Sequence, residues 1–110
     1  MHIDDLIDAT NLYINSEEQD RPQLSIPKEW AQGRTAYGGL TGALVYTAIR
    51  EKVSNDRLLR SFACNFVGPV ITEAPYDIEV EVLRQGKNVT QVIGKAIQDG
   101  NVCVMVQAAF

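Results

Sequence analysis

The sequence predicts a single α+β domain in which one long helix packs on the apolar face of an antiparallel sheet. Apolar side chains recur at helical spacing over residues 38–53, and after this stretch the pattern alternates with period two until the chain ends. The 110 residues, of which 45% are apolar and 22% charged, fit one ordinary globule with one core. We expect one domain, with a helix and loop over 1–23 and the core over 24–110.

The first half of the chain is predicted to contain two helices and one strand. Residues 3–13 space their apolar side chains as a helix does, and the first turn is acidic, which suits the helix dipole. A polar loop then leads to a short apolar run around Leu24 and Ile26, which we expect to be the first strand. The long helix over 38–53 begins with several glycines, and glycine in a helix usually permits close approach of a neighbouring backbone.

The second half is predicted to add four strands in a meander, which makes a sheet of five. Alternating apolar and acidic residues from Tyr76 to Val82 are typical of a strand with one buried face. The pair Asp99-Gly100 indicates a tight hairpin turn. The expected strands cover residues 58–67, 76–82, 89–98 and 102–110.

Charge and composition exclude several classes of function. With 14 acidic and 10 basic residues the chain has a net charge of −4, which argues against binding nucleic acid through its phosphates. No apolar stretch is long enough to span a membrane, and the N-terminus does not resemble a signal peptide. We therefore expect a cytoplasmic protein without nucleic-acid partners.

The residue inventory also restricts the chemistry. The only histidine is His2, which we expect to be mobile at the terminus, so schemes that need a positioned imidazole have no candidate. Cys64 and Cys103 lie apart in apolar runs and are predicted to be buried thiols. We expect no metal site and no cofactor, because neither the ligands nor the nucleotide-binding motifs are present.

Three segments together resemble a known family. They are Gly33-Arg34-Thr35-Ala36-Tyr37-Gly38-Gly39, Phe66-Val67-Gly68-Pro69 after Ser61-Phe62, and Val82-Leu83-Arg84-Gln85-Gly86-Lys87. In order and spacing they resemble the N-terminal hot-dog domain of the thioesterase II type acyl-CoA thioesterases, over about residues 24–110. The resemblance implies the hot-dog fold, an antiparallel sheet wrapped around a central helix. Members of this type carry two such domains, and the sequence stops where the first would end.

The resemblance implies an acyl-CoA thioesterase of lipid metabolism, which hydrolyses acyl-CoA to a free acid and coenzyme A. The groove would lie between two hot-dog domains, here supplied by a homodimer or larger homo-oligomer. The alternative is a non-catalytic hot-dog half that binds acyl groups or mediates dimerisation. A hydratase is the least favoured interpretation, since His2 is the only histidine.

Candidate catalytic residues are Gly39, Gln107 and Asn65. Tyr37, Gly38 and Gly39 open the long helix, where free backbone N–H groups can stabilise negative charge on a thioester carbonyl oxygen. The alternative is that these glycines serve only helix–sheet contact. Gln107 and Asn65 lie within predicted strands and could position a water molecule, or could be ordinary strand residues.

Candidate substrate-binding residues are Tyr37, Gly38 and three basic side chains. Arg34, Arg84 and Lys87 could bind the phosphates of coenzyme A, although exposed basic residues in turns are more often simply solvated.

Overall fold

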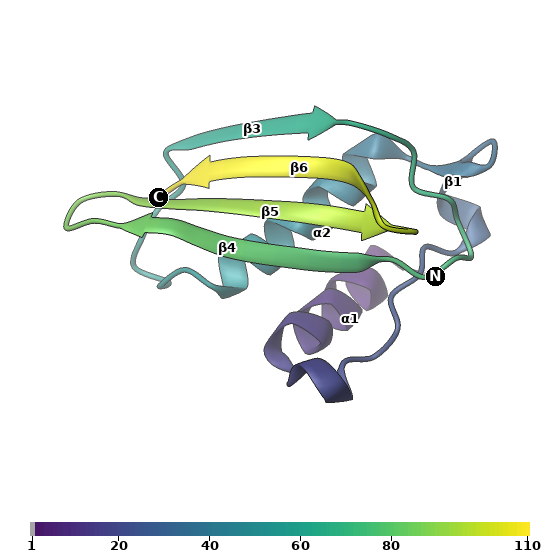
Figure 1. Ribbon diagram of the computed structural model, residues 1–110, viewed down its shortest axis with the longest axis horizontal. Helices are drawn as coiled ribbons and strands as arrows, with labels where there is room; N and C mark the ends of the chain where they lie inside the picture. Colours follow the sequence, from purple (N-terminus) through teal and green to yellow (C-terminus); the bar gives the residue numbers. More distant parts are fainter. Residues whose placement is uncertain (1) are drawn as a thin grey trace.

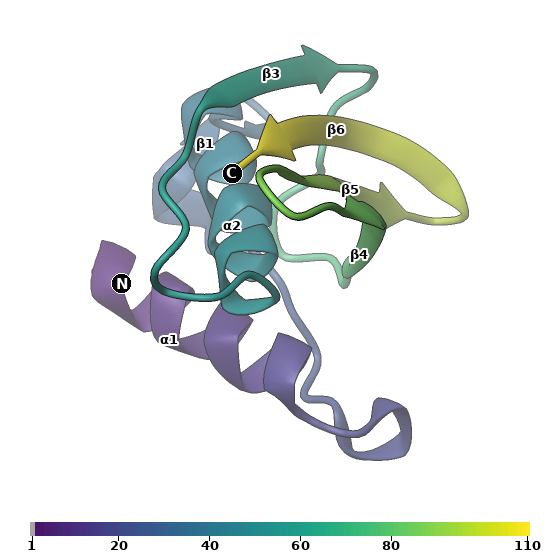
Figure 2. The same ribbon diagram turned by 90° about the vertical axis from the view of Figure 1, so that its left-hand side faces the viewer.

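The computed structural model describes residues 2–110 and confirms the α+β architecture (Figure 1). A four-stranded antiparallel sheet curves over α2, and α1 packs on α2 away from the sheet, as Figure 2 shows. The helices are α1 (Ile3–Asn15) and α2 (Gly38–Glu51), with single turns of 3-10 helix η1 (Glu18–Asp20) and η2 (Lys28–Trp30). The strands are β1 (Ala31–Gln32), β2 (Thr35–Ala36), β3 (Ser61–Phe66), β4 (Asp77–Gln85), β5 (Thr90–Gln98) and β6 (Asn101–Ala109).

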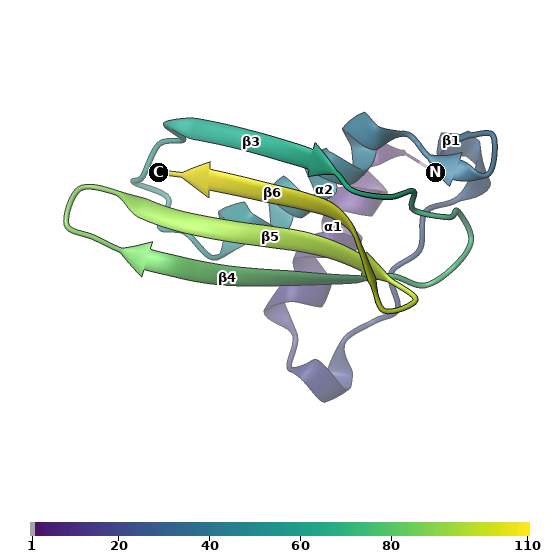
Figure 3. The same ribbon diagram turned by 45° about the horizontal axis from the view of Figure 1, so that its top comes forward.

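The order of strands differs from the predicted meander. The sheet runs β3-β6-β5-β4, so only β4, β5 and β6 follow one another, and β3 pairs with the last strand (Figure 3). The apolar run at Leu24 forms no strand but a single bridge to Tyr76, which leaves four strands in the sheet instead of five. A two-residue hairpin, β1 and β2, precedes α2 and was not predicted, because its strands are too short to show periodicity.

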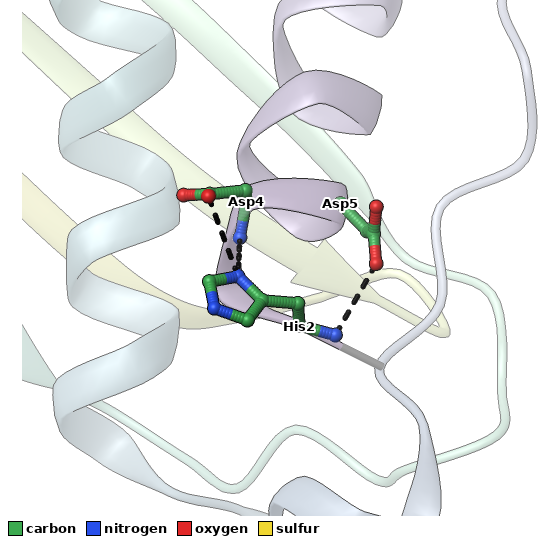
Figure 4. Close-up of polar contacts among 3 residues, drawn as sticks. All are labelled: His2, Asp4 and Asp5. Atoms are coloured by element: carbon green, nitrogen blue, oxygen red, sulfur yellow. Dashed lines mark hydrogen bonds and ion pairs between the residues drawn. The ribbon is translucent and has the colours of Figure 1, made fainter.

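The N-terminus corrects another prediction. His2 is the N-cap of α1: its Nδ1 accepts a hydrogen bond from the Asp4 backbone N–H at 3.1 Å, and its own backbone N–H donates to the Asp5 carboxylate at 3.2 Å (Figure 4). These reciprocal bonds form a capping box that satisfies the first N–H groups of the helix. The only histidine therefore has a structural place in the domain.

The helix α1 is tied to the core and to the far edge of the sheet. Leu6, Thr10 and Tyr13 are buried, and the Tyr13 hydroxyl donates to Asp77 Oδ1 at 3.0 Å. Burial, followed by the hydrogen bond to the Asp77 carboxylate, raises the pKa of Tyr13 above its ordinary value. The phenol therefore stays protonated and keeps donating at neutral pH.

The central helix lies against the middle of the sheet. Gly94 on β5 leaves no space for a side chain, since a Cβ there would lie 2.8 Å from side-chain atoms of Val45 and Ile49 on α2. The predicted turn between β5 and β6 is confirmed, with positive φ at both Asp99 and Gly100, as a type I′ hairpin requires. The helix is thus fixed against β5 and β6, whose register is held by a tight turn.

One buried amide orders the segment between β3 and β4. The Gln98 side chain accepts from the Ile71 N–H at 2.7 Å and donates to the carbonyls of Ile71 and Ala74 at 3.0 and 3.3 Å. It holds this segment beside β2, where Ile71 forms a single bridge with Thr35 and the Ala36 N–H donates to the Val70 carbonyl at 2.7 Å. The helix α2 begins two residues after Ala36, so this packing also positions the start of α2.

Candidate functional site

The first turn of α2 presents unpaired backbone donors. The N–H groups of Leu40 and Thr41 bond to the Tyr37 carbonyl at 3.1 and 3.2 Å, whereas within residues 2–110 those of Gly38 and Gly39 have no hydrogen-bond partner. Tyr37 is the N-cap and its side chain makes no capping bond. Two neighbouring donors at the positive end of a helix dipole can stabilise an oxygen that gains negative charge.

Backbone hydrogen bonds fix the position of this helix start. Tyr37 N–H donates to the Trp30 carbonyl at 3.1 Å, and the preceding residue, Ala36, is bonded to Val70. Trp30 is half-buried and packs against the core. The donors at Gly38 and Gly39 are therefore held on a rigid element, as preorganised stabilisation of charge requires.

An apolar groove of about 300 Å³ begins at these glycines and runs between the N-terminal half of α2 and β3. It is lined by Gly38, Gly39, Gly42, Ala43, Tyr46, Leu59, Phe62, Cys64 and Phe66. No charged side chain is among them, and β3 is an edge strand, so the groove is open on the side where the sheet ends. We call it the α2–β3 groove.

Glycines set how closely β3 approaches the helix. A Cβ on Gly38 would lie 3.1 Å from Phe66 Cε1, and one on Gly42 would lie 3.3 Å from Cys64 Sγ. The glycines predicted to permit close contact do so here, but part of the surface they create is open. The structure therefore supports both interpretations of the glycines, since close contact and access to the backbone occur in the same turn.

An aromatic cluster closes the other end of the groove. The ring of Tyr46 packs edge-on against Phe62 at 5.7 Å between centroids and stacks on Phe110 at 6.3 Å. Arg50 lies over the opposite part of the cluster, 5.1 Å from the Phe110 centroid. A ligand that enters at Gly39 therefore meets aromatic rings about two helical turns along α2.

Comparison with known sequences assigns the chain to a family. Residues 26–110 match the family described as the acyl-CoA thioesterase N-terminal domain. The chain belongs to this family. It is also 34% identical over 77 residues to acyl-CoA thioesterase 2 of Haemophilus influenzae, an alignment that covers 70% of this chain and 27% of that protein. The chain thus spans about a quarter of the length of this curated relative.

Solved structures confirm the hot-dog fold of this acyl-CoA thioesterase N-terminal domain. A protein of Thermobifida fusca assigned as a thioesterase II has a TM-score of 0.75 at 22% identity, with 94% of this chain and 38% of that chain covered. The PaaI protein of E. coli has a TM-score of 0.69 at 15% identity, with 79% and 67% covered. Among residues 2–110, no helix has the length and apolar character that a membrane crossing requires.

The domain does not bring all predicted catalytic residues together. Gly39 lies at the mouth of the groove, but Asn65 and Gln107 are exposed on the opposite face of the sheet. The pairing shows this directly, because Asn65 lies opposite Met105 and Gln107 opposite Ala63, while the residues between them face α2. Asn65 and Gln107 remain predictions, and neither reaches Gly39 within one chain.

The predicted basic residues occupy two ends of the sheet. Arg34 is exposed in the β1–β2 turn beside the start of α2. Arg84 and Lys87 are exposed around the β4–β5 turn, at the other end in Figure 1. The α2–β3 groove lies between them, so these three side chains cannot form one cluster in a single chain.

Sequence reasoning missed most of the groove lining. Leu59, Phe62 and Phe66 were included in an ordinary strand prediction, yet they are 44%, 47% and 61% exposed. Cys64, predicted to be buried, is only half-buried and lines the groove, whereas Cys103 is buried as predicted. The signal available in the sequence was the run of small residues on α2, which leaves the side chains of β3 partly uncovered.

We expect ligand in the groove to protect Cys64 from alkylation. Burial raises the pKa of the Cys64 thiol, so its reactive thiolate is scarce at neutral pH and iodoacetamide should react increasingly as pH rises from about 7 to about 10. At fixed pH, a hydrolysis-resistant long-chain acyl-CoA ketone analogue should slow the reaction. Mass spectrometry measures it, with the buried Cys103 as internal control, and an unchanged Cys64 rate would mean that the acyl chain lies elsewhere.

Proposed function

We propose that this domain hydrolyses acyl-CoA thioesters, with the acyl chain in the α2–β3 groove and the thioester carbonyl oxygen at the N–H groups of Gly38 and Gly39. The observation that carries this proposal is the continuity of the two features: an apolar groove begins at two unpaired donors. An acyl chain needs an apolar channel, and the oxygen of its carbonyl gains charge when water attacks. Membership of the acyl-CoA thioesterase N-terminal domain family supports the same reaction.

The proposal requires a second hot-dog domain against the β3 edge, and we propose that a second copy of this domain can supply it. The groove is open along the edge strand β3, and its exposed apolar side chains, including Phe62 and Phe66, would be covered if two β3 edges paired. Such pairing would also satisfy the free backbone groups of β3. It would convert an open groove into an enclosed site that excludes water from the acyl chain.

A second candidate function is an acyl-binding or dimerisation module without turnover. One observation favours it: the groove lining contains neither a carboxylate nor a side-chain amide that could activate water. In this case the helix terminus and groove would hold an acyl group without cleaving it. The two candidates differ in turnover and agree in binding.

Thiol release from short, medium and long acyl-CoAs by the purified 110-residue chain distinguishes them. We expect turnover by a dimer, with the mass in solution determined on the same sample. A stable dimer that binds the ketone analogue but releases no thiol would establish the non-catalytic module. A monomer that neither binds nor hydrolyses acyl-CoA would contradict both.

A further inference from the structure

A basic hollow lies at the end of the sheet away from the helix N-terminus. It has a volume of about 610 Å³ and is lined by Asp56, Arg57, Leu58, Leu59, Arg60, Lys87, Asn88 and Phe110. Three of these side chains are basic and one is acidic, although the whole chain carries a net charge of −4. Arg84 lies close to the hollow, beside the β4–β5 turn: its Nε is 3.9 Å from the position that a Cβ on Gly86 would take. The local charge is therefore opposite to that of the protein.

One basic side chain of the hollow is fixed by hydrogen bonds, and the other two are free to bind a ligand. Arg57 Nη2 donates to the carbonyls of Gly86 and Lys87, each at 3.1 Å, which ties the β4–β5 turn to the segment before β3. The side chains of Arg60 and Lys87 are exposed and take part in no hydrogen bond or ion pair found among residues 2–110. The Asp56 carboxylate accepts a hydrogen bond from the Ser54 hydroxyl, and the nearby Arg57 also stabilises its charge, so Asp56 offsets Arg57 and not Arg60 or Lys87. Free guanidinium and ammonium groups on a fixed turn suit a phosphate.

The hollow lies in the wrong place to bind the polar end of a ligand whose acyl chain occupies the groove of the same chain. Strand β3, with six residues, spans about 17 Å between the helix start and the hollow at about 3.4 Å per residue. The intervening surface is the apolar α2–β3 groove, which also shares Leu59 with the hollow. If the acyl chain fills that groove from Gly39 toward Leu59, the polar leaving group must extend the other way, past Phe66.

Two-fold pairing of β3 edges brings the two features together. An isologous contact between identical edge strands is antiparallel, so the Ser61 end of one copy lies beside the Phe66 end of the other. The hollow lies at the Ser61 end, because Arg60 N–H bonds to Ala109, the residue paired with Ser61. Gly38 lies at the Phe66 end. The basic hollow of each copy would then border the groove mouth of the other.

We propose that the basic hollow of one copy, through Arg60 and Lys87, binds the phosphate groups of the acyl-CoA whose acyl chain occupies the groove of the second copy. This inference rests on the proposed function for the identity of the ligand. It explains why the basic side chains gather at the end of the sheet that is remote from the free N–H groups. Each complete site would contain residues from both copies.

Complementation between two variants tests this arrangement. Arg60→Glu/Lys87→Glu reverses the charge of the hollow, and Ala43→Trp fills the groove from an exposed helix position. Each variant alone should bind the hydrolysis-resistant acyl-CoA ketone analogue about tenfold more weakly or worse. Co-expressed at equal levels, they should form mixed dimers with one doubly altered site and one intact site, so that about one quarter of all sites regain the affinity of the unmodified protein.

Lys52→Glu/Lys95→Glu is the matched control, because it makes the same change in charge at a hollow beside β4, the opposite edge of the sheet. It should leave affinity nearly unchanged. Mixed dimers that remain weak at every site would place both features of a site in one chain and overturn the proposal, as would failure of the unmodified protein to bind the analogue or to dimerise. Complementation in a protein that releases no thiol would sustain this inference while contradicting the proposed hydrolysis.

Discussion

Gly39→Val is expected to abolish thioester hydrolysis while leaving the domain folded. A Cβ at Gly39 would lie 2.7 to 3.0 Å from ring atoms of Tyr37, an exposed side chain at the N-cap. The valine and the displaced ring would cover the free N–H groups that we assign to the carbonyl oxygen. Loss of one such donor typically lowers kcat by about 10²–10³-fold. Thiol release measures kcat, and circular dichroism measures the fold.

Two controls separate this effect from general damage. Glu51→Val puts the same β-branched residue at an exposed position in the last turn of α2 and should retain turnover. Gln107→Ala tests the prediction that remains for Gln107: its amide lies on the other face of the sheet, so kcat should change by less than about twofold. A loss of about tenfold, the scale of one positioned catalytic group, would instead confirm Gln107 as a site residue. Retained activity in Gly39→Val would remove the helix N-terminus from the mechanism.

The fold was predictable where the pattern is local. The start of α2 at Gly38 follows from helical spacing, and the Asp99-Gly100 hairpin follows from turn chemistry. The position of β3 beside β6 was not predictable in this way, because alternation assigns faces to a strand but does not name its neighbour. The strand predicted around Leu24 is absent for a related reason: an apolar run does not show its neighbour, and this segment makes only one bridge, to Tyr76.

The site was predictable at its helix terminus and not along its walls. Tyr37, Gly38 and Gly39 carry a local signal, since glycines at a helix start expose the backbone. Phe62 and Phe66 carry none, because an apolar residue on a strand has the same pattern whether α2 covers it or leaves it exposed. Which of them stay open depends on how far β3 extends beyond the helix, and this is a property of the three-dimensional packing.

Gly94→Ala adds a single methyl group and is nevertheless expected to lower the free energy of unfolding strongly. The new methyl group would lie 2.8 Å from Cδ1 and Cγ1 of Ile49 and from Cγ1 of Val45, and both side chains are fully buried. Both lie in the packed core, so their side chains must leave their present rotamers or α2 and β5 must move apart. Overpacking of this kind typically costs about 1–3 kcal/mol and occasionally more. Urea-induced unfolding measures it at a fixed protein concentration, because the apparent stability of any chain that self-associates depends on concentration.

Gly68→Ala separates this clash from the ordinary effect of replacing glycine. A Cβ at Gly68 meets no atom within 4 Å, and its φ is not positive, so alanine there should leave stability unchanged or raise it by up to about 1 kcal/mol through the unfolded chain. In an Ile49→Ala background the cost of Gly94→Ala should shrink, since part of the clash has been removed. If Gly94→Ala and Gly68→Ala were equally stable, α2 would be free to move away from β5. The α2–β3 groove would then have no fixed width, because α2 forms one of its two walls.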